Sequence, residues 1–259
     1  MQVADFVNKH EGCLGFVVGS APSLYYDGML NKLPLLKDYV VMTVNAGCAA
    51  LKNFDYFCGD DYGLRWWRYY QELLAEHPCI KFLYKAKLKD AISHFKEEEV
   101  VLFDHKPWFV PSENKYYKSG LVFTKEEPLL GARSVMGTAI HLLYLMSCDP
   151  IVLLGADACY SKDRKRYFWQ YFTPELQKQL CMERSTGEKA FCFPNHGWID
   201  GYPVDSHSTA FIEYFDKLAV QCKKQNVNII NASGGVLDCF PRMSLTEVLE
   251  KYGDRKKQK

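Results

Sequence analysis

The sequence predicts an α/β fold in which a mostly parallel sheet carries helices on both faces. First, short apolar runs recur along the 259 residues and end in small or polar residues, as buried parallel strands do. Second, helical patterns separate many of these runs, which is the order of a sheet wound with helices. Third, hydrophobic residues make up 48% of the chain and charged residues 24%, a composition that supports a sizeable core.

The stretch 14–24 is the organising element, because there an apolar run breaks into Gly-Ser-Ala-Pro-Ser. Gly19 lets a ligand approach the main chain, and Pro22 suits the first turn of a helix. Ser20 or Ser23 would cap that helix. A strand, a tight turn and a helix N-terminus form an anion site, because free N–H groups and the helix dipole point the same way. We therefore expect a phosphate or nucleotide here; the alternative is an ordinary strand-to-helix turn.

The rest of the sheet follows from further apolar runs. Six of them are predicted as strands, over 39–47, 54–61, 80–84, 100–103, 150–157 and 227–231. Helices are predicted over 64–76, 131–147, 207–225 and 244–252. Ligands bind at the carboxyl ends of parallel strands, so Asn45, Asp60 and Asp157 are candidate binding residues. Each also has a structural alternative, as a turn residue, a solvated loop residue or a cap.

The segment 158–203 differs in character, being rich in aromatic and basic residues. A long insertion of this kind after a sheet strand is more typical of a lid or substrate loop than of a core. The segment 106–130 is predicted as irregular, with three prolines and mixed charges. We therefore expect one domain over residues 1–259 with a lid at about 158–203.

Composition excludes several classes of protein. Lys and Arg number 32 against 31 Asp and Glu, so nothing indicates a nucleic-acid partner. No apolar run is long enough to cross a membrane, and the N-terminal residues lack the pattern of a signal peptide. The ten cysteines are scattered without zinc-ligand spacing, which indicates reduced thiols, a cytoplasmic location and no structural zinc. A homo-oligomer is compatible with the sequence.

Taken in order, the motifs resemble those of the bacterial lipooligosaccharide sialyltransferases. The matching motifs are Gly19 to Leu24, Asn45, Arg133-x-x-x-Gly137, Leu154 to Tyr160 and His207 at the start of a late helix. The same order resembles the broader MptE-like superfamily, which includes 6-hydroxymethylpterin diphosphokinase-like proteins and motility accessory factors. The resemblance implies a Rossmann-like domain with a lid that transfers sialic acid from CMP-sialic acid without a metal or other cofactor.

The resemblance also implies which residues bind the nucleotide. They would come from strand ends and from the start of the helix near 131, namely Gly19, Ser20, Ser23, Asn45, Asp60, Gly137 and Asp157. The first three would contact phosphate and sugar. The partners of such an enzyme are a nucleotide sugar and a glycan or other acceptor that carries a hydroxyl group.

The catalytic roles implied by the resemblance fall on four residues. Tyr160 and Tyr167 would hydrogen-bond the departing phosphate, with Arg133 beside them. Without a metal, hydroxyls and a guanidinium are suitable donors to that developing charge. His207 would deprotonate the acceptor hydroxyl, as an imidazole can near pH 7. His196 is its closest rival, and packing within the lid alone would explain the tyrosines.

Three functions therefore stay open. The first is a metal-independent glycosyltransferase that uses a CMP-activated nonulosonic, sialic-acid-like donor. The second is an Mg²⁺-dependent 6-hydroxymethylpterin diphosphokinase-like enzyme, with ATP at the first turn and Asp60, Asp61 or Asp157 near the metal. The third is a nucleotide-binding module without catalysis, because Ser20-Ala21 stands where the sialyltransferases have Asn-Gly.

Overall fold

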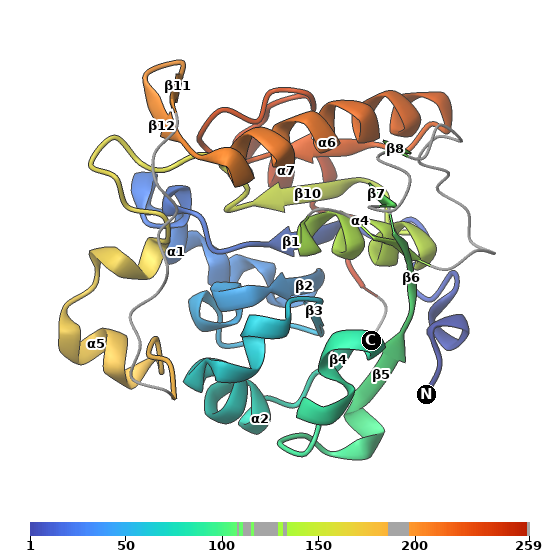
Figure 1. The fold of residues 1–259 in the computed structure, drawn as a ribbon. Helices are drawn as coiled ribbons and strands as arrows, with labels where there is room; N and C mark the ends of the chain where they lie inside the picture. The colour runs from blue at the N-terminus through green and yellow to red at the C-terminus, as the bar shows by residue number, and fades with distance from the viewer. Residues whose placement is uncertain (108, 111–114, 117–128, 132–133, 186–196, 258–259) are drawn as a thin grey trace.

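A seven-stranded parallel sheet forms the centre of the molecule (Figure 1). The computed structural model describes residues 1–107, 109–110, 115–116, 129–131, 134–185 and 197–257. The sheet strands are β1 (Gly15–Val18), β2 (Val40–Val44), β3 (Tyr56–Gly59), β4 (Ile80–Tyr84), β5 (Val100–Phe103), β10 (Ile151–Leu154) and β13 (Ile229–Asn231). All seven lie within apolar runs that the sequence predicts as strands, so the α/β, Rossmann-like fold class is confirmed.

The strand order is β13-β10-β1-β2-β3-β4-β5, with β1 inside the sheet. From β1 the chain winds outward to β5, and then returns to place β10 on the other side of β1. Gly15 is therefore paired with Val40 on one side and with Ile151 on the other. This reversal at β1 and β10 is the topological switch point, where sheets of this kind bind ligands at the carboxyl ends of their strands.

Helices cover both faces of the sheet, because alternate strand residues point to opposite sides. Helices α4 (Val135–Leu145) and α6 (Ser206–Lys224) pack on one face, where Val17 and Met42 belong to the core. The other face, with Phe16 and Val41, is covered by short helical segments and by α7 (Leu245–Tyr252). Ser244 caps α7 in the capping-box form that its sequence predicts.

The remaining elements are short. They are α1 (Met29–Lys32), α2 (Leu74–Glu76), α3 (Lys85–Leu88), α5 (Pro174–Gln179), β6 (His105–Pro107), β7 (Phe109–Val110), β8 (Lys115–Tyr116), β9 (Leu129–Gly131), β11 (Gly197–Ile199) and β12 (Tyr202–Val204). Strands β6 to β9 lie in and beside the segment 106–130 that was expected to be irregular. No helix in the part of the chain described here is long and apolar enough to cross a membrane.

Two predicted helices differ from expectation. After the first strand the chain forms a 3₁₀ turn, Pro22–Leu24, and α-helical structure begins only at Met29, in α1. The helix predicted over 64–76 is divided into a 3₁₀ segment, Tyr62–Trp66, a π segment, Tyr69–Leu73, and α2. The division has a physical cause, because the main chain around Trp67 pairs with residues near Arg184 and cannot continue a helical hydrogen-bond pattern.

The described part of the 158–203 insertion crosses the carboxyl edge of the sheet. Figure 1 shows it leaving the end of β10, passing α1 and continuing to α5. Phe168, Trp169 and Met182 of this segment are buried in the core on the α7 face. At these three positions the expectation of a segment outside the core is wrong, and the insertion is anchored to the sheet by apolar side chains.

Candidate functional site

The turn that follows β1 packs directly against the turn that follows β10. The Gly19 N–H donates to Leu154 O at 2.8 Å, and the Ala21 N–H donates to Gly155 O at 3.2 Å. A Cβ on Gly19 would lie only 2.4 Å from Gly155 O. Close approach of two main chains thus requires glycine here, whether or not a ligand also lies against this turn.

Asp157 binds the start of the turn where an anion was expected. The Ser23 N–H donates to Asp157 Oδ2 at 2.8 Å, and the Ser23 hydroxyl donates to Oδ1. Burial raises the pKa of Asp157 to about 6, although both hydrogen bonds from Ser23 act in the opposite direction. A phosphate that bound Ser23 would therefore have to displace the chain's own carboxylate.

Asn45 follows β2 beside the same turn. Its φ is +50°, in the left-handed region, and its Oδ1 is buried with no hydrogen-bond partner among the residues that the structure describes. A strained backbone and an unsatisfied buried acceptor are both typical of ligand-binding positions. The oxygen is suited to accept a hydrogen bond from an amino or hydroxyl group of a ligand.

Gly47 joins the Asn45 segment to the first turn, and its replacement by alanine is expected to destabilise the fold. The added Cβ would lie 2.3 Å from Val18 O and 2.6 Å from Gly19 O, both main-chain atoms. Overpacking against backbone costs about 1–3 kcal/mol of unfolding free energy or more, which urea denaturation measures. Gly197→Ala is the control, since its nearest contact would be at 3.9 Å. Equal losses in the two variants would contradict this reading of Gly47.

The start of α4 reaches the carboxyl edge and meets Asp60 after β3. The Ser134 side chain caps α4 and accepts from the Met136 N–H at 3.2 Å, and Gly137 lies in the first turn. Asp60 is buried and hydrogen-bonds to Thr138. Burial raises the pKa of Asp60 to about 6, the Asp61 charge raises it further, and Lys87 and Thr138 oppose the shift. Arg133, expected to open this helix, lies outside the described residues.

Asp205 contacts Tyr160, one of the residues that were expected to be catalytic. It is completely buried and caps α6, accepting from the Ser208 N–H at 2.7 Å through Oδ1. Its Oδ2 accepts from the Tyr160 hydroxyl at 2.8 Å and lies 3.5 Å from Arg166 Nη1. Burial alone would raise the pKa of Asp205, but hydrogen bonds from Ser208 and Tyr160 together with the Arg166 charge lower it. The carboxylate is therefore charged at neutral pH.

Arg166 links the two predicted tyrosines. Its guanidinium lies 5.7 Å from the Tyr160 ring centre and 5.6 Å from that of Tyr167. The neighbouring Phe168 N–H donates to Ser20 O at 3.1 Å, which ties this segment to the first turn. His207 is exposed in the first turn of α6, two residues after Asp205. The structure thus connects the two tyrosines through Arg166, and His207 lies near them along the chain, two residues after Asp205.

Asp205 and Arg166 were not among the candidate site residues predicted from the sequence. For Asp205 a signal was present, because Asp205-Ser206-His207 has the form of a helix cap. For Arg166 there was none, since it is one of several basic residues in the insertion. His196, the rival of His207, lies outside the described residues. No group of three or more His, Cys, Asp or Glu suited to a metal occurs among the described side chains.

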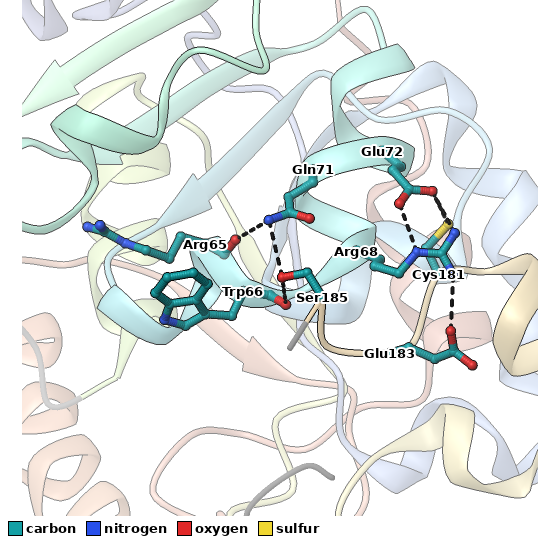
Figure 2. A network of polar contacts seen from close by, with 8 residues as sticks. All are labelled: Arg65, Trp66, Arg68, Gln71, Glu72, Cys181, Glu183 and Ser185. Carbon is teal, nitrogen blue, oxygen red and sulfur yellow. Dashed lines mark hydrogen bonds and ion pairs between the residues drawn. The ribbon is translucent and has the colours of Figure 1, made fainter. Parts of the chain in front are cut away.

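The part of the insertion around Glu183 is held by a polar clasp, which we define as Arg68, Glu72 and Glu183 (Figure 2). The Arg68 guanidinium lies 2.8 Å from Glu72 and 3.0 Å from Glu183. Beside it the Ser185 N–H donates to Trp66 O at 2.7 Å. The Ser185 hydroxyl donates to the same oxygen at 3.1 Å, as Figure 2 shows. The insertion therefore begins after β10 and is fastened again near α2, on the β3–β4 side of the sheet.

Arg68→Ala is expected to release residues 181–185 with little global loss of stability. The clasp is mostly exposed, so it contributes less than about 1 kcal/mol to unfolding, but it is bidentate and bridges two segments. We expect the Ser185 amide to exchange with solvent about five times faster, measured by hydrogen–deuterium exchange. Lys217→Ala removes an exposed ion pair on α6 and serves as the control. Unchanged exchange at Ser185 would show that the clasp does not hold the insertion.

The fold and the carboxyl-edge site define an α/β protein of Rossmann-like architecture. No protein-family model and no curated protein sequence matches this chain. A MAf glycosyltransferase from Magnetospirillum magneticum AMB-1 is similar in structure, with a TM-score of 0.54 and 13% sequence identity. The match covers 98% of this chain and 41% of that structure. The chain therefore shares its fold with part of a glycosyltransferase and spans less than half of that protein's length.

Proposed function

We propose that the chain is a metal-independent glycosyltransferase that moves a nonulosonic sugar from a CMP-activated donor to an acceptor hydroxyl. The observation that carries the proposal is the Asp205 centre, which joins Tyr160 and Arg166 to the start of α6, where His207 lies. The structural similarity to a glycosyltransferase along nearly the whole chain supports it. The sequence resemblance to sialyltransferases supplies the donor.

The leaving group would be stabilised from the insertion side of the site. When the bond between the anomeric carbon and the phosphate oxygen breaks, its electron pair stays on the phosphate. Arg166 would offset that charge, and the Tyr167 hydroxyl would donate a hydrogen bond to it. The single Tyr160 proton is already donated to Asp205, so Tyr160 would reach the phosphate only by giving up that hydrogen bond. Asp205 would keep Arg166 in place for its role.

The acceptor would be activated from the helix side. His207 is exposed at the first turn of α6, so an acceptor hydroxyl can reach its imidazole. It would take the hydroxyl proton as the oxygen attacks the anomeric carbon. The nucleotide would lie along the ends of β1, β2 and β3, where the Asn45 Oδ1 offers an acceptor.

The Mg²⁺-dependent diphosphokinase remains the alternative, and Asp157 bears on it. Both oxygens of Asp157 accept hydrogen bonds from Ser23, so a metal bound there would share the carboxylate with these two donors. Asp60 is buried with a raised pKa of about 6, which also disfavours the charged form that a metal needs. These features favour the glycosyltransferase.

A thermal-shift panel tests the proposal with CMP, CDP, UDP, ATP and GTP, each with Mg²⁺ and with EDTA. We expect a cytidine-selective shift that is equal with and without the metal. Ligand at one hundred times its Kd adds about 2.7 kcal/mol, which is roughly 5–10 °C for a chain of this size. A shift that needs both ATP and Mg²⁺ would replace the proposal with the diphosphokinase. The absence of a shift with every nucleotide would remove the basis of the proposal.

His207→Ala is expected to lower turnover of CMP-sialic acid about 100- to 10,000-fold while the CMP thermal shift is retained. Turnover is lost because the base is removed. The CMP shift is retained because the proposed nucleotide site lies at the strand ends. Release of CMP in the presence of EDTA measures it. His94→Ala alters an exposed histidine in the β4–β5 connection and is the control. Full turnover in His207→Ala would assign the base elsewhere.

A further inference from the structure

Three tyrosines form an aromatic ledge, which we define as Tyr25, Tyr26 and the half-buried Tyr171. Tyr25 and Tyr171 are stacked with ring centres 4.5 Å apart, and Tyr26 packs edge-on against both. Tyr25 is 41% exposed and Tyr26 is 40% exposed. Single exposed aromatic rings are common on proteins, but adjoining rings rimmed by polar groups mark an interaction site.

Asp163 supplies the polar rim of the ledge. Its Oδ1 accepts hydrogen bonds from the Tyr171 hydroxyl at 2.5 Å, from the Ser161 hydroxyl at 2.6 Å and from the Tyr26 hydroxyl at 3.3 Å. Its other oxygen, Oδ2, accepts no hydrogen bond from the side chains that the structure describes. The hydrogen bonds from Ser161 and Tyr171 lower the pKa of this exposed carboxyl, so it is charged at neutral pH. A charged oxygen thus lies beside exposed aromatic rings with capacity for a further donor.

We propose that the ledge and Asp163 form a saccharide subsite that holds the acceptor. The C–H face of a sugar ring packs on an aromatic surface, and its hydroxyl groups donate to a carboxylate. The tyrosine hydroxyls are already oriented by Asp163, so the surface is preorganised. The identity of the bound saccharide as the acceptor rests on the proposed function. Binding of a saccharide to the ledge does not depend on that function.

The position of the ledge supports an acceptor over a nucleobase. Tyr25 lies two residues after Ser23 on the segment that leaves β1, and Tyr171 and Asp163 lie on the segment that leaves β10. Asn45 and Asp60 follow β2 and β3, on the opposite side of β1. If the nucleotide extends toward Asn45, the β10 side of the site, where the ledge lies, stays available for the acceptor.

Saturation-transfer NMR with lactose, maltose and cellobiose tests the subsite, run beside the CMP thermal shift on the same preparations. We expect at least one of these neutral disaccharides to bind, and Tyr25→Ala and Asp163→Asn each to weaken that binding about tenfold. Asp163→Asn keeps the size of the side chain and controls for misfolding of the alanine variant. Tyr62→Ala changes a tyrosine that is 52% exposed outside the ledge and should leave binding unchanged.

The outcomes separate the two proposals. Disaccharide binding that both ledge variants weaken supports the subsite, and it does so even where the CMP shift is absent and the proposed function fails. A CMP shift without disaccharide binding overturns the subsite and leaves the glycosyltransferase proposal standing. If a disaccharide binds and neither variant weakens that binding, the saccharide site does not lie on the ledge and the inference is overturned. Loss of the CMP shift in Tyr25→Ala would make the ledge a base-stacking surface, which also overturns the inference.

Discussion

Asp205→Ala is expected to lower the free energy of unfolding by about 3–5 kcal/mol, the usual loss when one member of a buried charged pair is removed. Three partners lose their acceptor together: the Ser208 N–H at the start of α6, the Tyr160 hydroxyl and the Arg166 guanidinium. The lost helix cap alone costs about 1 kcal/mol. The melting temperature should therefore fall by roughly 6–20 °C.

Asp205→Asn is the matched control. An asparagine caps a helix about as well as an aspartate, so the Ser208 hydrogen bond is retained while the charge opposite Arg166 is lost. We expect about half the loss of stability and, in both variants, a large loss of CMP release from the donor. Equal stability of Asp205→Ala and the unaltered chain in urea denaturation would contradict the central role given to this residue.

Asp157→Asn is expected to flatten the dependence of stability on pH. The pKa of Asp157 is raised from an ordinary value near 4 to about 6 by burial. Between these values the unfolded carboxyl has released its proton while the folded one retains it, so the native state binds more protons and stability falls as pH rises. A shift of this size corresponds to about 3 kcal/mol lost between pH 4 and pH 7.

The measurement is urea denaturation at intervals between pH 4 and pH 7.5. The asparagine variant cannot ionise, and it should lose about 2–3 kcal/mol less than the unaltered chain over that range. Asp60, also raised to about 6, keeps the remaining slope. Asp254→Asn changes an exposed carboxyl near the C-terminal end of α7 and is the control. Parallel curves for Asp157→Asn and the unaltered chain would show that Asp157 is not titrating in this window.

The sheet could be predicted from the sequence because its strands are local apolar runs. The run Ile151–Leu154, which is buried along its whole length, predicts a strand without knowledge of the residues that it packs against. The helix over 64–76 could not be predicted correctly, because its pattern is helical but its main chain pairs with residues near Arg184. Tertiary hydrogen bonds to a distant segment override local preference, and nothing within the window 64–76 reveals them.

The candidate site could be predicted in part. The rule that ligands bind at strand ends correctly placed Asn45, Asp60 and Asp157 at the carboxyl edge. Their pairings could not be read from the sequence, since Asp157 meets Ser23 only after β10 has come to lie beside β1. The same holds for Tyr160 and Asp205, which meet because the Tyr160 main chain pairs with Pro203 of β12.

The position of β1 between β2 and β10 has a consequence for biosynthesis. Residues 15–18 pair with residues 40–43 soon after both leave the ribosome, but their other partners are residues 151–154. Until those are made, one side of β1 is an open apolar edge able to pair with another chain. The nascent chain is therefore most prone to aggregation before residues 151–154 have been synthesised. Translation that stalls before residue 151 should yield insoluble protein in the absence of chaperones.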